Sequence, residues 1–320
     1  MSEFLQKPVK NIKKDSYMPA MGGSEILRQG LYKHTNISKH KDINIILSTP
    51  SYENVKFTKK NILWQHLSYS DSSLGLLKDP GFLKSIDSWV YVSNWQIEKF
   101  RYIYQIPVHN AYVIKNAIEP IEFISKPKGD KLKLIYTSTP FRGLGILLDV
   151  MSLLDRDDIE LDVYSSNDIY GSDYADHTGN VYDEIFKKAK NTKNVNYKGY
   201  ASNEYVKKAL QESHIFAYPS IFEETCCLAM IEAGAAGCDM VTTNIGALYE
   251  TGSEYAKLVP IQATEQDIVA SYAEALNETI DNYWGIKNQE KLKEQSDFYN
   301  KYYNWEDKAK EWNRLFDKMS

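Results

Sequence analysis

The chain has 320 residues, of which 43% are hydrophobic and 25% are charged, and this excludes a disordered, collagen-like or small disulfide-stapled protein. At roughly 150 residues per domain, the length favours two globular domains. The 38 Lys and Arg residues against 43 Asp and Glu give a net charge of −5, so we expect no nucleic acid as a partner.

The first part of the chain alternates strand and helix patterns. Nearly continuous apolar runs predict parallel strands buried on both faces, at 43–49, 61–67, 89–95 and 111–118. Helical patterns lie at 24–35, 78–86 and 96–104. The first helix follows Gly22 and Gly23, with Ser24 as a plausible N-cap. Because residues 1–20 hold no convincing strand, we expect the first domain to be reduced.

A break between residues 119 and 131, where Pro120, Pro127 and Gly129 interrupt the pattern, is the best domain boundary. Strand patterns then resume near 132–138, 159–165, 195–200, 214–219, 239–243 and 257–261. Helices alternate with them at about 143–154, 181–190, 202–212, 226–236 and 265–283. The α/β alternation predicts two Rossmann-like, doubly wound domains, at 1–122 and 123–300, and a C-terminal helix at 301–320.

The C-terminal helix carries an apolar stripe. Trp305, Ala309, Trp312 and Phe316 follow one another at spacings of 4, 3 and 4 residues, which places them on one helix face. This face needs an apolar surface to cover.

Two Rossmann-like halves usually bind a ligand in the cleft between them, at the carboxyl ends of the strands. The chain contains neither the G-x-G-x-x-G motif of dinucleotide sites nor the G-x-x-x-x-G-K-[ST] loop of ATP sites. The sequence therefore indicates another kind of ligand.

The segment 218–251 holds the most informative acidic pair. Seven residues separate Glu224 from Glu232, and the small and apolar residues between them predict a buried helix that begins near Cys226. On such a helix the two carboxylates lie ~12 Å apart along the axis, on roughly the same face. The helix N-terminus attracts anions, so the segment suits a nucleoside diphosphate sugar whose hydroxyls bind the carboxylates. An amphipathic helix with exposed glutamates is the alternative.

A second element supports an anionic ligand. In "LIYTSTPFRGLGILLDV" a strand ends in a loop that contains Pro140, Arg142 and Gly143 and leads into a helix. A guanidinium at the carboxyl end of a strand suits phosphate oxygens, whereas a surface ion pair is the plain alternative for Arg142 alone.

These motifs resemble the retaining glycosyltransferases of family 4, which have the GT-B fold, and the resemblance runs from Gly22 to about Phe316. "ETCCLAMIEAGAAG" is similar to the family's E-x7-E segment, and "STPFRGL" to its phosphate loop. "GGSE" at 22–25 resembles the glycine loop on the acceptor side, and "WQH" offers His66 near the donor sugar. "NWEDKAKEW" looks like the terminal helix that crosses back to the first domain.

The resemblance implies a role for each matching residue. Glu232 would bind the ribose hydroxyls and Glu224 a hydroxyl of the transferred sugar. Arg142 and the helix N-terminus would bind the leaving diphosphate. His66, Arg142 and Glu224 are the candidate catalytic residues, and the donor-binding segment also includes Thr225, Cys226, Cys227 and Leu228. Gly22, Gly23 and Ser24 form the acceptor-side loop, and neither metal nor cofactor is implied.

The interpretation is therefore a glycosyltransferase that moves a sugar from a nucleotide sugar to a saccharide, lipid-linked or protein acceptor. A non-catalytic nucleotide-sugar binder or partner subunit stays open because the first domain is reduced. A glycoside hydrolase fits poorly, since its carboxylates stand about 5–9.5 Å apart. The oligomeric state is open.

The three cysteines, Cys226, Cys227 and Cys238, lack metal-ligand or disulfide-framework spacing, so we expect reduced, buried thiols. No apolar run reaches the ~18 residues of a membrane span, and we expect a cytoplasmic protein. Lys7, Lys10, Lys13 and Lys14 leave peripheral membrane contact open.

Overall fold

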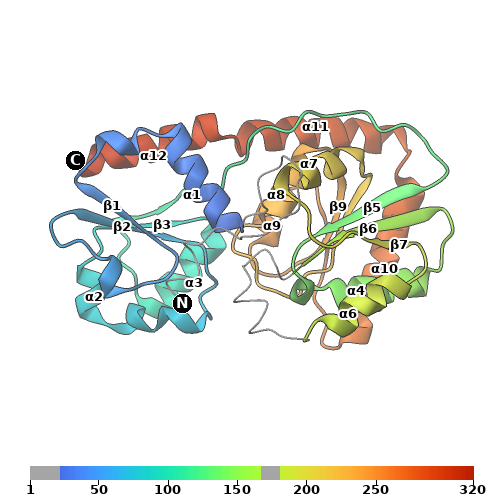
Figure 1. Cartoon of the computed structure of the whole chain (residues 1–320), viewed down its shortest axis with the longest axis horizontal. Coiled ribbons are helices and arrows are strands. Elements are labelled where there is room, and N and C mark those ends of the chain that lie inside the picture. Colours follow the sequence, from blue (N-terminus) through green and yellow to red (C-terminus); the bar gives the residue numbers. More distant parts are fainter. Residues whose placement is uncertain (1–21, 167–180) are drawn as a thin grey trace.

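The computed structural model describes residues 22–166 and 181–320, which form two lobes side by side (Figure 1). We call residues 22–118, with the four-stranded sheet, and the last helix the N-lobe. Residues 121–302, with the six-stranded sheet, are the C-lobe. Residues 1–20 lie outside the described residues. The predictions made for this segment, membrane contact through its lysines and the lack of a strand, therefore stay predictions.

The N-lobe sheet is parallel, in the order β1-β2-β3-β4, with β1 Ile43–Leu47, β2 Lys60–Gln65, β3 Ser88–Tyr91 and β4 Ala111–Val113. Alternate side chains pack on opposite faces, as the strand period requires. Ile62 and Trp64 pack with α1 Gly23–His34, whereas Leu63 packs with α2 Pro80–Lys84 and α3 Asn94–Tyr104. Short 3-10 helices lie at Ile37–Lys39, Tyr52–Asn54 and Ser72–Lys78.

The C-lobe sheet is also parallel, in the order β10-β9-β8-β5-β6-β7. Its strands are β5 Leu132–Thr137, β6 Ile159–Tyr164, β7 Val195–Tyr197, β8 Ile215–Tyr218, β9 Asp239–Thr243 and β10 Lys257–Val259. Its helices include α4 Leu144–Leu154, α6 Asp183–Asn191, α7 Asn203–Glu212, α8 Leu228–Ala235, α9 Leu248–Gly252 and α10 Glu265–Asn282. From β5 the chain adds β6 and β7 on one side of the sheet, and it then returns to add β8, β9 and β10 on the other side. The boundary between β5 and β8 is therefore the topological switch point, where parallel sheets bind ligands.

The last two helices span both lobes (Figure 1). Helix α11, Ile286–Tyr302, packs on α8 of the C-lobe, and α12, Trp305–Met319, packs on α1 of the N-lobe. The ring of Trp312 lies 4.9 Å from that of Trp64, and Trp305 lies against Gly30 of α1. The apolar stripe of the terminal helix therefore covers the N-lobe core.

The chain crosses between the lobes twice, and the two crossings are joined. Ile118 N donates to Tyr303 O over 2.7 Å, and Ile118 forms a bridge with Asn304. A few residues on, the Asn300 amide binds both backbone groups of Ile121, at 2.7 and 2.9 Å.

The α/β fold class with parallel sheets is confirmed, although some element bounds were wrong. The strand expected over 89–95 ends at Tyr91, because Ser93 caps α3 and Asn94 begins it. The strand expected over 111–118 ends at Val113. The helix expected from Cys226 begins at Leu228, and α9 was not foreseen. The three domain ranges stay predictions.

The three cysteines are free and buried, as the sequence predicted. Within the described ranges, no helix combines the length and the apolar character that crossing a membrane requires.

Candidate functional site

Arg142 lies at the switch point because of a glycine. The loop after β5 forms a 3-10 turn, Pro140–Arg142, and Gly143 follows with φ of 104°. A Cβ on Gly143 would lie 2.0 Å from the carbonyl oxygen of Pro219, in the loop after β8. Only glycine tolerates both this backbone conformation and this approach, and it brings Arg142 against the β8 loop.

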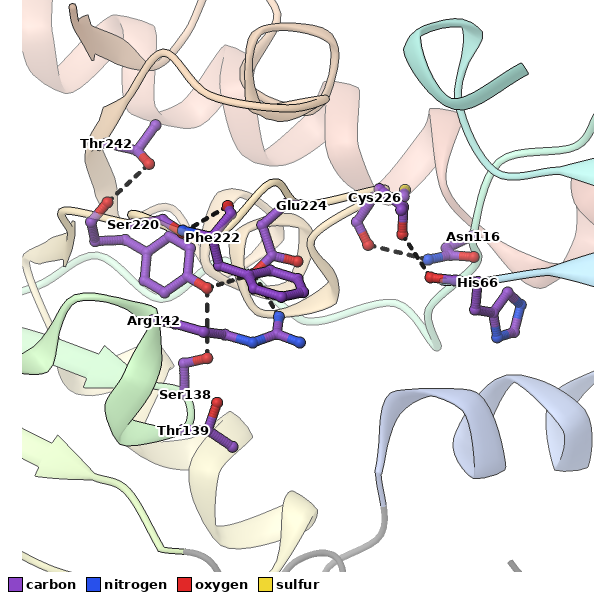
Figure 2. A network of polar contacts seen from close by, with 12 residues as sticks. His66, Asn116, Ser138, Thr139, Arg142, Ser220, Phe222, Glu224, Cys226 and Thr242 are labelled. Atoms are coloured by element: carbon purple, nitrogen blue, oxygen red, sulfur yellow. Dashed lines mark hydrogen bonds and ion pairs between the residues drawn. The ribbon is translucent and has the colours of Figure 1, made fainter. Parts of the chain in front are cut away.

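Glu224 does not lie on α8, so the expectation that both glutamates share one helix face was wrong. It lies in the loop between β8 and α8, and its side chain is only 6% exposed. Arg142 Nη1 donates to Glu224 Oε1 (Figure 2). The Tyr218 hydroxyl donates to the same oxygen over 2.6 Å. Two donors on a buried carboxylate compensate for its lost hydration.

The guanidinium of Arg142 is held between two aromatic rings. It lies 4.6 Å from the ring centroid of Phe222 and 5.5 Å from that of Phe141. Phe222 is fixed by a tight turn in which its N–H donates to Ser220 Oγ over 3.1 Å. Cation–π contacts of this kind orient a guanidinium plane without consuming its N–H donors.

Glu232 lies on α8 at a pocket between the lobes. Lys207 of α7 is 3.8 Å away, and burial raises the pKa of Glu232, although Lys207 opposes this shift. The pocket has a volume of about 330 Å³ and is lined, among others, by Gln29, Lys33, Lys207, Leu228, Glu232 and Trp305. The second glutamate therefore faces a space that both lobes enclose.

His66 joins the acceptor-side loop to the donor segment. Its Nδ1 lies 2.9 Å from Ser24 Oγ, and its carbonyl accepts a 2.9 Å hydrogen bond from Thr225 Oγ1. Its Nε2 is buried and has no hydrogen-bond partner among the residues that the structure describes. Burial lowers the pKa of His66 to about 3, so the imidazole is neutral at physiological pH.

Helices α1 and α8 meet at their N-termini. Gly22, which has no side chain, and Cys227 are their N-caps, and the Cys227 side chain makes no capping hydrogen bond. A Cβ on Gly23 would lie 3.0 Å from Leu228 Cδ1, so the two helix starts are close. Each helix N-terminus carries partial positive charge, and two together attract an anion. Cys226 stays a thiol, because burial raises its pKa to about 11.

Sequence reasoning singled out neither Tyr218 nor Glu250, although both lie in the informative segment 218–251. Tyr218, which ends β8, holds Glu224, and a tyrosine at a strand end carries no recognisable signal. Glu250 of α9 binds the start of α3 and Lys115, which only the fold brings near. Within residues 22–166 and 181–320, no three His, Cys, Asp or Glu side chains gather as a metal site.

Comparison with known proteins agrees with this architecture. The profile of the family described as "Glycosyl transferases group 1" matches residues 119–297. No curated protein sequence matches the chain.

Solved structures resemble the chain in fold. The pneumococcal O-GlcNAc transferase GtfA, bound to UDP and GlcNAc, is 12% identical at a TM-score of 0.64, over 93% of this chain and 60% of its own. TarM is 17% identical at a TM-score of 0.63, over 91% of this chain and 58% of its own. Sucrose-phosphate synthase from Thermosynechococcus elongatus is 16% identical at a TM-score of 0.64, over 98% of this chain and 82% of its own. The chain thus spans about three-fifths of the length of the first two.

Proposed function

The chain belongs to the group 1 glycosyl transferases, and from this membership we propose that it moves a sugar from a nucleoside diphosphate sugar to an acceptor hydroxyl, with retention of configuration and without a metal ion. The observation that carries the proposal is the meeting of Arg142 and Glu224 at the switch point of the C-lobe sheet, with Glu232 on the following helix. The narrower family 4 assignment is part of the proposal.

The diphosphate, the transferred sugar and the ribose of the donor each have a matching group. Arg142 and the backbone N–H groups of the segment from Thr225 to Leu228, which leads into α8, receive the diphosphate. Glu224 accepts a hydrogen bond from a hydroxyl of the transferred sugar, and Glu232 from the ribose. The neutral imidazole of His66 lies near the transferred sugar. The loop Gly22–Ser24, which contacts His66 through Ser24, lies on the acceptor side.

Positive charge fixed beside the diphosphate drives the departure of the leaving group. As the bond from the anomeric carbon to the phosphate oxygen breaks, charge develops on the diphosphate, and preorganised donors stabilise it. The acceptor oxygen attacks from the same face, and its proton passes to the departing phosphate oxygen. No protein nucleophile is assigned to this reaction.

We propose an acceptor from one of three classes: a saccharide, a lipid-linked acceptor or a protein. The related GtfA structure contains UDP and GlcNAc, so UDP sugars come first among the donors to test. We propose that the protein works in the cytoplasm, with peripheral membrane contact if the acceptor is lipid-linked.

The decisive experiment is a calorimetric titration with UDP, GDP and ADP and then with their sugars, followed by an assay for released nucleotide. Binding with slow donor hydrolysis, unchanged by a chelator, supports the proposal, and retention is read from the anomeric signal of the product. Loss of turnover on chelation overturns the metal-free mechanism. Binding without release, across a broad acceptor panel, favours a non-catalytic binder instead. Equal affinity of the wild type and Glu232→Ala removes the role of Glu232.

A further inference from the structure

The backbone around His66 is held at three successive carbonyl groups. Gln96 Nε2 donates to Gln65 O over 3.3 Å and to Leu67 O over 2.9 Å. The carbonyl between them, that of His66, accepts from Thr225 of the C-lobe. The position of the imidazole therefore depends on one side chain of its own lobe and one of the other lobe.

Gln96 is itself held in place by burial and by hydrogen bonds. It is fully buried in the first turn of α3, and its Oε1 accepts from Val92 N over 2.9 Å. Its backbone N–H donates to Ser93 Oγ, the N-cap of the helix. Any displacement of the first turn of α3 therefore moves the two carbonyls that flank His66.

The first turn of α3 is fixed from the C-lobe by Glu250. The Glu250 carboxylate accepts from Asn94 N and Trp95 N, at 3.0 and 2.5 Å, and from Lys115 Nζ at 3.1 Å. Its side chain is 9% exposed. A carboxylate at a helix N-terminus binds the orphan N–H groups and the positive end of the dipole, so this is a strong contact between the lobes.

Glu250 is tied in turn to the donor segment. The turn before α9 contains Gly246, with φ of 60°, and a Cβ there would lie 2.6 Å from the backbone N and O of Glu224. Ala247 N donates to Glu224 O over 2.7 Å. Glu224 and Glu250 therefore move together as one part of the C-lobe.

We propose that Glu250 is a positioning residue for His66, acting across the lobes through the first turn of α3 and the side chain of Gln96. Thr225 completes the arrangement from the donor segment. Both contacts run from the C-lobe to the N-lobe, so a separation of the lobes would release His66 from both at once. This inference rests on the proposed function, because it concerns the placement of a residue assigned to the reaction.

The test compares Glu250→Gln with Glu254→Gln, an exposed glutamate just beyond α9. In Glu250→Gln one carboxylate oxygen becomes an amide N–H₂, which cannot accept a hydrogen bond. Some of the hydrogen bonds to the start of α3 and to Lys115 are therefore lost. We expect kcat to fall about tenfold in Glu250→Gln, with the KM for the donor changed less than about twofold, because misplacement of a reacting group affects turnover more than binding. Glu254→Gln should match the wild type. Equal kcat values for the two variants would overturn the proposal.

A spectroscopic measurement keeps this test separate from the proposed function. The imidazole ¹⁵N signals of His66, assigned with His66→Gln, should shift in Glu250→Gln and stay unchanged in Glu254→Gln, without any nucleotide. Unchanged signals in a folded Glu250→Gln protein would refute the coupling even if the enzyme is active. Shifted signals in a protein that turns over no donor would leave the coupling standing and remove the proposed function.

Thr225 offers a matched pair for the second contact. Thr225→Val keeps the side-chain shape and removes the donor to His66 O, whereas Thr225→Ser keeps the hydroxyl. We expect Thr225→Val to shift the same His66 signals and lower kcat, and Thr225→Ser to restore both. Equal behaviour of the two variants would contradict a role for this hydrogen bond in placing His66.

Discussion

Arg142 and Glu224, which lie 82 residues apart in the chain, pair directly at the carboxyl edge of the C-lobe sheet. The pair forms because the loops after β5 and β8 meet at Gly143 and Pro219. A guanidinium has five N–H donors, so one contact with Glu224 is compatible with a bidentate phosphate contact. The pair therefore joins the group assigned to the diphosphate to the group assigned to the sugar.

Substitution of Arg142 should separate phosphate binding from nucleoside binding. Arg142→Ala removes charge-assisted hydrogen bonds, so we expect the nucleoside diphosphate to lose about 1.5–3 kcal/mol more binding free energy than the nucleoside. It also leaves Glu224 buried with one donor fewer, which should cost about 3 kcal/mol of folding stability. Calorimetric titration and urea unfolding measure the two effects.

Arg156→Ala is the matched control, because both arginine side chains are 23% exposed and Arg156 pairs with Asp158 and Asp281 instead. Nucleotide affinity should be unchanged in this variant. A similar loss of nucleoside and nucleoside diphosphate affinity in Arg142→Ala would contradict a phosphate role.

Glu232 should make the protein less stable as the pH rises. Burial raises the pKa of Glu232 above its ordinary value of 4.5. Between 4.5 and this raised pKa the folded state holds a proton that the unfolded chain has released, so the free energy of unfolding falls with increasing pH. Each pKa unit of difference contributes about 1.4 kcal/mol.

Urea unfolding of the wild type and Glu232→Gln at a series of pH values measures this contribution. The stability of the wild type relative to the variant should decrease across the window above 4.5 and then level off. A relative stability that increases with pH would show that the pairing with Lys207 outweighs burial.

Two nearby glycines should respond in opposite ways to alanine. Gly143→Ala requires a positive φ and places a Cβ 2.0 Å from the Pro219 carbonyl, so we expect a loss of about 3 kcal/mol or more. Gly145→Ala, in the first turn of α4, should gain roughly 0.5–1 kcal/mol, because among the described residues no heavy atom beyond its chain neighbours and its own helix backbone lies within 4 Å of the added Cβ. Thermal unfolding of both variants decides the matter, and a stable Gly143→Ala protein would refute the close approach.

The imidazole of His66 should not titrate between pH 5 and 8, since burial lowers its pKa to about 3. Its ring signals, identified by their loss in His66→Gln, should stay at neutral positions over that range. A midpoint near neutrality would show that water reaches the ring, and it would assign His66 a charged role.

Much of the C-lobe could be predicted from the sequence because its signals are local. Continuous apolar runs mark β5, β8 and β9 to within one or two residues, since a strand buried on both faces needs no polar position. Arg142 was placed correctly after β5 for the same reason, because a loop that follows such a strand reaches the carboxyl edge of the sheet.

The start of α8 could not be predicted, because Thr225 is engaged elsewhere. A threonine before an apolar run is a usual N-cap, yet its hydroxyl binds the His66 carbonyl, 159 residues away in the chain. The helix begins three residues later, at Leu228, and Glu224 is left in a loop. The same argument applies to Glu250, whose partners at the start of α3 only the folded chain brings near.

The two chain crossings between the lobes determine how the lobes can move. A single connecting segment would allow one lobe to rotate in any direction relative to the other. Here Ile118 is hydrogen-bonded to Tyr303, and Ile121 is hydrogen-bonded to Asn300. Two joined segments restrict the lobes to a hinge motion about one axis. An opening motion about this axis would break the hydrogen bond of Thr225 to the His66 carbonyl together with those of Glu250 to the start of α3.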